Sequence, residues 1–200
     1  MASFHISYGK TMAHEGVYSN DPSDRGGETY KGIARKFHSD WKGWSVIDEV
    51  KEQVNVSDLN KTLEANTYLN TLVRFFYKQK FWDKLQLDSI NGQELADELF
   101  DTAVNQGVKT AAYYFQRSLN FLNNNQKHYS DIKEDGMVGA QTIKAFNAYM
   151  LTAMFSSRST ARNIHTLIKS ISFFQMQRYV EICENNPRQE VFFYGWLNRV

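Results

Sequence analysis

The sequence has 200 residues, a formal net charge of +1 and 42% hydrophobic residues, a composition that excludes an intrinsically disordered chain. No basic stripe is present to neutralise phosphates, which argues against a nucleic-acid-binding protein. A single cysteine, Cys183, excludes an internal disulfide and makes a cysteine-rich metal site a poor candidate. Aromatic residues reach 14%, which suits a large core and also a groove that stacks sugar rings. The sequence does not decide between a core role and a sugar-stacking role for Trp41, Trp44 and Trp82.

The long segments with apolar residues at every third or fourth position, together with only two prolines, predict a mainly α protein. A first helix is predicted over residues 4–15, with Gly16 as its stop. Turn-forming residues then predict one small, irregular β-hairpin within residues 18–32. Further helices are predicted around Leu95 and Leu99 and over residues 41–52, 65–80, 109–122, 142–155 and 160–184.

The N-terminus lacks the basic segment and long apolar core of a signal peptide. No run approaches the roughly 18 apolar residues that a membrane-spanning helix requires. We therefore expect a protein that is synthesised in the cytoplasm without a signal peptide and without stable membrane insertion. If it acts outside the cytoplasm, another component must release it.

Residues 14–33, HEGVYSNDPSDRGGETYKGI, concentrate ionisable and turn-forming residues more tightly than any other stretch. Glu15 lies at the predicted end of the first helix, beside apolar neighbours and at the negative end of the helix dipole. Both surroundings raise the pKa of a carboxyl group. A raised pKa is what a general acid requires near neutral pH, so Glu15 is the first candidate for catalysis.

A hairpin that returns along the end of the first helix brings Asp24 and Thr29 beside Glu15. Glu15 can then protonate a leaving oxygen, while Asp24 and Thr29 orient a water on the opposite face, as in a glycoside hydrolase. Gly26 and Gly27 permit positive φ and close approach of a substrate. Taken singly, each polar residue also has an ordinary role at a helix end, in a turn or in a strand.

Four further residues are predicted to contact the substrate. Tyr18 and Tyr30 belong to the hairpin. Asp101 and Asn105 share one face of a predicted helix, where they can line a groove and hydrogen-bond sugar hydroxyl or acetamido groups. Asp101 is equally suited to capping a neighbouring helix.

Residues 14–33 resemble the N-terminal signature of glycosyl hydrolase family 108, which comprises phage-endolysin-like N-acetylmuramidases that are also called secretion activators. The family pattern of E-G-G-Y, D-x-G-G-x-T and G-I is matched from Glu15 to Ile33, with Val17 in place of the second glycine. Three later segments also resemble the family: residues 100–107 (FDTAVNQG), 135–142 (DGMVGAQT) and 194–200 (YGWLNRV). The second has the pattern D-G-x-x-G-x-x-T, which is shared with predicted peptidoglycan-binding regions. Asp135 and Gly136 are expected to form a turn there, with Thr142 starting or bracing a helix.

This resemblance implies a mainly α, lysozyme-like fold. A catalytic portion is expected over residues 1–107 and a closely packed, helical peptidoglycan-binding portion over residues 108–200, although one compact domain is also possible. The implied activity is that of an N-acetylmuramidase, with Glu15 as the catalytic acid. The similar spacing in phage-type lysozymes adds Asp24 and Thr29. Neither a metal nor an organic cofactor is implied.

The implied partner is the glycan strand of peptidoglycan. Release to the wall by a holin suits a phage or prophage product, and a secretion system is the other route. Two alternatives stay open: a lytic transglycosylase that uses Glu15 as both acid and base, and a non-catalytic wall-binding or secretion-accessory protein. Hydrolysis leaves reducing ends, transglycosylation leaves anhydro-muramic ends, and a binding protein releases no fragments.

Overall fold

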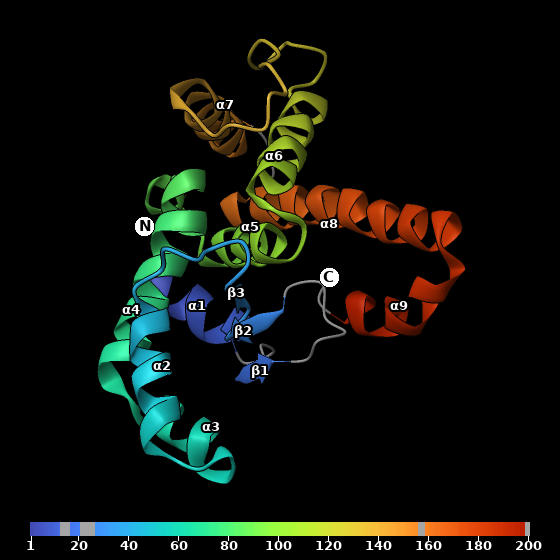
Figure 1. Cartoon of the computed structure of the whole chain (residues 1–200). Helices are drawn as coiled ribbons and strands as arrows, with labels where there is room; N and C mark the ends of the chain where they lie inside the picture. The colour runs from blue at the N-terminus through green and yellow to red at the C-terminus, as the bar shows by residue number, and fades with distance from the viewer. Residues whose placement is uncertain (13–16, 21–26, 156–158, 199–200) are drawn as a thin grey trace. The chain divides into compact units, whose positions relative to one another are not determined.

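The computed structural model describes residues 1–12, 17–20, 27–155 and 159–198. The chain divides into two compact units, a smaller one made of Tyr8–Lys80 and a larger one made of Met1–Ser7 with Phe81–Val200. Both are mainly α (Figure 1), which confirms the predicted class, and the boundary between the two units falls within helix α1 (Phe4–Met12). Among the described residues, no helix is long and apolar enough to cross a membrane.

The smaller unit contains an antiparallel sheet of three short strands in this order: β1 (Tyr18–Asn20), β2 (Glu28–Tyr30) and β3 (Ile33–Ala34). β2 is the central strand, and its Thr29 pairs with Ser19 and Ala34 on either side. The turn between β2 and β3 places Lys31 and Gly32 at φ 44° and 76°, the left-handed pair of a tight hairpin turn. The predicted hairpin is therefore confirmed, and β3 extends it.

Three helices follow in the smaller unit: α2 (Gly43–Gln53), α3 (Val56–Ala65) and α4 (Thr67–Tyr77). A π-helical turn, Lys78–Trp82, follows α4. The core of this unit includes the fully buried side chains of Ile47, Leu63 and Val73. α4 lies within the predicted segment 65–80, and α2 matches the predicted segment 41–52 but ends one residue later. α3 was not predicted, because only Leu59 and Leu63 give it an inward face.

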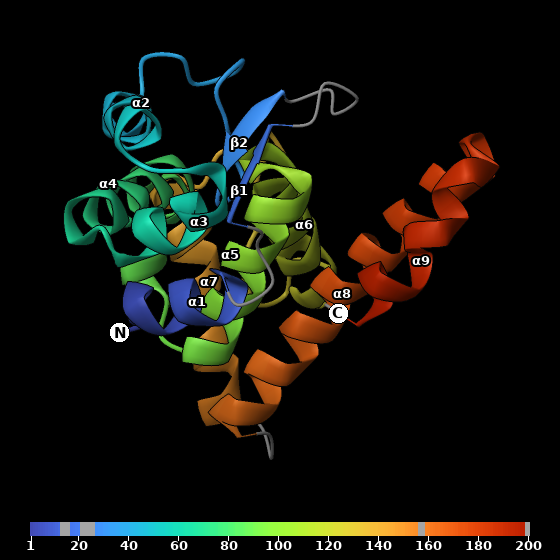
Figure 2. The ribbon, with the colours of Figure 1, turned by 60° about the horizontal axis from the view of Figure 1, so that its bottom comes forward.

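The larger unit has five helices among the described residues: α5 (Gln93–Gln106), α6 (Val108–Leu122), α7 (Ala140–Leu151), α8 (Thr160–Asn185) and α9 (Glu190–Leu197). α6 packs against α5, α7 and α8, and α9 folds back beside the end of α8 (Figure 2). Phe4, Trp82 and Phe100 meet edge to face in the core, with ring centroids 5.7, 5.8 and 6.0 Å apart. α9 was not predicted, because its short sequence is apolar on every side.

A stripe of polar side chains lies between α5 and α8. Ser172 Oγ donates to Glu98 Oε1 at 3.2 Å. Thr102 Oγ1 donates to Gln175 Oε1 at 3.4 Å, and Gln175 Nε2 donates to the Tyr179 hydroxyl at 3.3 Å. Burial raises the pKa of Glu98 to about 7, so its charged form opposes folding at neutral and higher pH.

Replacement of Glu98 by glutamine is expected to remove a pH-dependent loss of stability. Because the folded-state pKa lies above the ordinary value of 4.5, wild type binds a proton on folding, and its free energy of unfolding falls as the pH rises from 4.5 through about 7. Above this range, Glu98→Gln is expected to be more stable than wild type by up to about 3 kcal/mol.

Urea unfolding on both sides of this pH range measures the effect. Glu184→Gln, an exposed position on α8, is the matched control. An unchanged pH dependence in Glu98→Gln would contradict the assignment.

Candidate functional site

The two predicted catalytic carboxylates, Glu15 and Asp24, lie outside the described residues. The third predicted catalytic residue, Thr29, is half-buried at the centre of β2. β1 ends and β2 begins on either side of the stretch that contains Asp24, and Asn20 pairs with Glu28 at this point. The sheet therefore holds Asn20 and Glu28, which flank that stretch in the sequence, side by side.

The carboxylate of Glu28 anchors this sheet and is only 12% exposed. Its Oε1 accepts hydrogen bonds from the Tyr18 hydroxyl and from Lys51 Nζ, both at 2.8 Å. Its Oε2 accepts a hydrogen bond from Arg35 Nη1 at 2.7 Å. Burial acts to raise the pKa of Glu28, but the donors Arg35, Lys51 and Tyr18 outweigh it and lower that pKa below 4.5. Glu28 is therefore an ionised anchor at neutral pH.

Arg35 extends the anchor to α2. Both of its terminal nitrogens donate to the Asp48 carboxylate, one at 2.8 Å, in a bidentate pair. Its guanidinium carbon lies 5.1 Å from the centroid of the Trp44 ring. Its backbone N–H donates to the Glu28 carbonyl oxygen at 2.8 Å. The hydrogen bonds that Arg35 donates to Asp48 and Glu28 raise the pKa of its guanidinium further above the usual value. The sheet is thus fixed to the first turns of α2.

The two tyrosines predicted to contact substrate have different surroundings. Tyr18 is half-buried on β1, with its hydroxyl bound to Glu28 and its ring centroid 5.6 Å from Lys51 Nζ. Tyr30 is fully buried, and its hydroxyl donates to the Leu63 carbonyl oxygen at 3.2 Å. Tyr30 is therefore a core residue, and its burial argues against direct contact with a ligand. Substrate contact by Tyr18 stays a prediction.

Asp101 and Asn105 lie together on α5, as their spacing predicts. Asn105 Nδ2 donates to Asp101 Oδ2 at 2.8 Å and to the Asp101 carbonyl oxygen at 3.0 Å. Asn105 is exposed and Asp101 is half-buried. This pair belongs to the larger unit, whereas Tyr18 and Thr29 belong to the smaller. Its contact with sugar stays a prediction.

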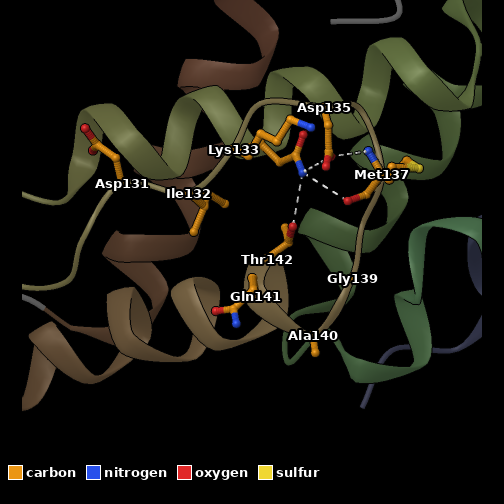
Figure 3. A pocket seen from close by; sticks show the side chains of 10 residues that line it. Asp131, Ile132, Lys133, Asp135, Met137, Gly139, Ala140, Gln141 and Thr142 are labelled. Carbon is orange, nitrogen blue, oxygen red and sulfur yellow. Dashed lines mark hydrogen bonds between the residues drawn. The ribbon is translucent and has the colours of Figure 1, made fainter.

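Figure 3 shows a cavity of about 440 Å³ in the larger unit, formed by α6, the loop before α7 and the start of α7. Gln116 of α6, which is 2% exposed, fixes this loop. Its Nε2 donates to Asp135 Oδ1 at 3.0 Å, the Met137 carbonyl oxygen at 3.0 Å and Thr142 Oγ1 at 3.2 Å. Its Oε1 accepts from the Gly136 N–H at 2.8 Å. Every polar atom of this buried amide is therefore used to hold the wall of the cavity.

The loop has the structure that the D-G-x-x-G-x-x-T pattern predicts. Gly136 has φ 72°, and a Cβ there would lie 2.8 Å from the Lys109 carbonyl oxygen, so only glycine fits. Hydrogen bonds from Gln116 and from the Met137 N–H lower the pKa of Asp135. Thr142 is 2% exposed and braces the start of α7. The expected turn and brace are confirmed.

The chemistry that this cavity offers is mixed. Lys133 and Gln141 are exposed along its lining, and α7 begins there without a side-chain cap on its first N–H groups. Lys133 and the uncapped helix start offer donors to a carbonyl or hydroxyl oxygen, and Asp131 and Asp135, which also line the cavity, offer acceptors. Within the described parts of the chain, no three His, Cys, Asp or Glu side chains come together in a way that could hold a metal ion.

Comparison with known proteins adds to this geometry. Residues 8–107 match the sequence model of Glycosyl hydrolase 108, and residues 110–200 match that of the Predicted Peptidoglycan domain. The structure of Brucella abortus SagA is similar, with a TM-score of 0.58 and 20% identity over 98% of this chain and 88% of that chain. This low identity shows a shared fold alone. No curated protein sequence matches significantly. The two sequence models support a peptidoglycan hydrolase or binder.

Replacement of Glu28 by glutamine is expected to destabilise the smaller unit. The amide loses charge-assisted hydrogen bonds from Arg35 and Lys51, and we expect the free energy of unfolding to fall by about 2 kcal/mol at neutral pH. Because the folded-state pKa of Glu28 lies below 4.5, its contribution is complete above that pH and is lost as the pH falls through the lower folded value. The difference between variant and wild type should therefore shrink in acid.

Chemical denaturation across the acid range measures both effects. Glu49→Gln, an exposed position on α2, is the matched control. Equal stability of Glu28→Gln and wild type at neutral pH would show that the anchor is dispensable.

Proposed function

The chain belongs to the glycosyl hydrolase 108 family, and on this premise we propose that it is an N-acetylmuramidase. It hydrolyses the β-1,4 bond between N-acetylmuramic acid and N-acetylglucosamine in peptidoglycan. The observation that carries the proposal is the family match over residues 8–107, a region that contains Glu15 and the D-x-G-G-x-T turn. The match over residues 110–200 supports peptidoglycan as the ligand. We assign catalysis to residues 1–107 and wall binding to residues 108–200.

In the proposed reaction, Glu15 gives its proton to the glycosidic oxygen as the bond to the anomeric carbon breaks. A water attacks the anomeric carbon, and its proton passes to Asp24. Thr29 assists by hydrogen-bonding this water. The products are one strand with a new reducing end and one with a free hydroxyl. The place of Thr29 on the central strand, where it pairs with Ser19 and Ala34, supports a fixed position for its hydroxyl group.

The state of Glu28 supports the choice of Glu15 and Asp24 as the catalytic carboxylates rather than Glu28 itself. Glu28 accepts three hydrogen bonds, two of them from cations, and its pKa is lowered. A general acid needs the opposite shift, because it must carry a proton near neutral pH. Glu28 therefore serves as an anchor rather than as an acid.

The cavity of Figure 3 is the proposed point of attachment to the wall. Its lysine and its uncapped helix start suit the carbonyl oxygens of wall peptides and acetamido groups, and its two aspartates suit their N–H groups. Attachment through the larger unit keeps the enzyme on an insoluble substrate between cleavage events. We propose that a holin or a secretion system brings the protein to this substrate.

Glu15→Gln is expected to abolish hydrolysis while leaving wall binding intact. The amide cannot donate the catalytic proton, so release of soluble fragments from purified peptidoglycan should fall by about a hundredfold or more. Glu52→Gln, an exposed position on α2, should keep wild-type activity. If Glu15→Gln digests walls at the wild-type rate, the assignment of the acid is wrong.

Lys133→Ala is expected to weaken attachment to the wall without changing the fold. Loss of one exposed cation at the cavity should reduce affinity by about fivefold. Co-sedimentation of the Glu15→Gln protein with insoluble peptidoglycan measures this without digestion. Lys169→Ala, an exposed position on α8, is the matched control. Equal sedimentation of the two variants would contradict a role for this cavity.

A further inference from the structure

The smaller unit contains a further cavity, of about 350 Å³, between residues 38–42 and α4 with the turn that follows it. Aromatic rings contribute much of its lining: Trp41, Tyr68, Phe75 and Phe76. None of the predicted catalytic or substrate-binding residues within the described part of the chain lines it. We propose that this cavity is a carbohydrate-binding site that takes sugar units of an acidic glycan strand.

The first observation is that α4 carries a second apolar stripe, which is not packed in the core. Leu69 and Val73 form the inward stripe and are fully buried. Tyr68 and Phe75 lie on a second stripe with Leu72 between them, and each of the two rings is 58% exposed. Exposed rings that adjoin a cavity mark a place where a ligand covers them.

The second observation is that the Trp41 ring is held in place before any ligand arrives. It stacks on Tyr30 with ring centroids 6.5 Å apart and planes 20° apart. It meets Trp44 and Phe76 edge to face, at 5.3 and 6.2 Å. A Cβ on Gly43 would lie 2.1 Å from a carbon of the Trp41 ring, so glycine is needed for this ring position. A fixed ring loses little conformational entropy on binding.

The third observation is the polar rim. Asp40, Lys42, Gln79 and Lys80 line the cavity and are exposed. His38 also lines it, and burial together with Lys80 lowers the pKa of the imidazole. The imidazole is therefore neutral at pH 7, with one donor and one acceptor nitrogen. Two lysines against one aspartate leave the rim with a net positive charge.

These three features match one ligand class. A sugar ring presents an apolar C–H face, which packs on aromatic rings, and hydroxyl and acetamido groups at its edge, which hydrogen-bond polar side chains. An acyl chain would leave the charged rim without partners. The net positive rim favours a glycan that carries carboxylates, as peptidoglycan strands do. The choice of peptidoglycan rests on the proposed function, whereas the cavity itself does not depend on Glu15.

Nuclear magnetic resonance of the full chain tests the proposal, with Glu15→Gln to prevent cleavage of the ligand. The probes are the neutral tetramer of N-acetylglucosamine and a soluble peptidoglycan fragment that keeps its carboxylates. The indole N–H signal of Trp41 is expected to shift and saturate with both probes. The signal of Trp82, whose Nε1 donates to Asp88 in the larger unit, is the internal reference.

Variants at the exposed rings make the test specific. Tyr68→Ala and Phe75→Ala are expected to weaken binding of both probes by about tenfold. Phe37→Ala removes a ring that is 67% exposed in the same unit but lies outside the cavity, and should bind like the parent protein. The double change Lys42→Gln with Lys80→Gln should weaken only the acidic probe.

Two outcomes overturn the site: a Trp41 signal that does not move at high probe concentration, or Phe75→Ala that binds both probes with unchanged affinity. Failure of the site and failure of the hydrolase are distinguishable. Wall digestion by wild type without a Trp41 shift rejects the site alone. Saccharide binding at Trp41 without any released wall fragments rejects the hydrolase alone.

Discussion

The smaller unit depends on the hydrogen bonds that the ionised carboxylate of Glu28 accepts. This carboxylate collects hydrogen bonds from β1, from the segment after β3 and from α2, through Tyr18, Arg35 and Lys51. A sheet with strands of two or three residues has too few ladder hydrogen bonds to be stable alone. The charge-assisted bonds to Glu28 supply the missing constraint. Through them, β1 and β2 are fixed relative to α2.

The same anchor connects the sheet to the aromatic cavity. Arg35 binds Glu28 and also lies over Trp44, and Trp44 meets Trp41 edge to face. Tyr30, on the central strand, stacks on Trp41 from within the core. A single packed cluster therefore positions both the strand that carries Thr29 and the ring proposed to receive sugar. Tyr30 thus contributes to the position of the Trp41 ring from within the core.

Much of the fold follows from local sequence patterns, whereas the contacts that build the sites do not. The three-to-four spacing of apolar residues predicted the helices that became α2, α4, α6, α7 and α8. The Gly136 turn and the Thr142 brace were also predicted. α3 and α9 were missed, because the first has too few apolar residues and the second too many to show a helical period.

Glu28, Arg35 and Lys51 are far apart in sequence and form no motif, so their network emerges only from the folded chain. The proposed roles of Glu15 and Asp24 depend on the family resemblance, because a single carboxylate in a sequence does not by itself indicate catalysis.

The central claim is that this protein cleaves the glycan strand by attack of water. Mass spectrometry of the fragments that the wild-type protein releases from purified peptidoglycan tests it most directly. The account predicts fragments that end in reducing N-acetylmuramic acid, because water supplies the new hydroxyl. Fragments that end in anhydro-muramic acid, or a wall that is bound but yields no fragments, would contradict it.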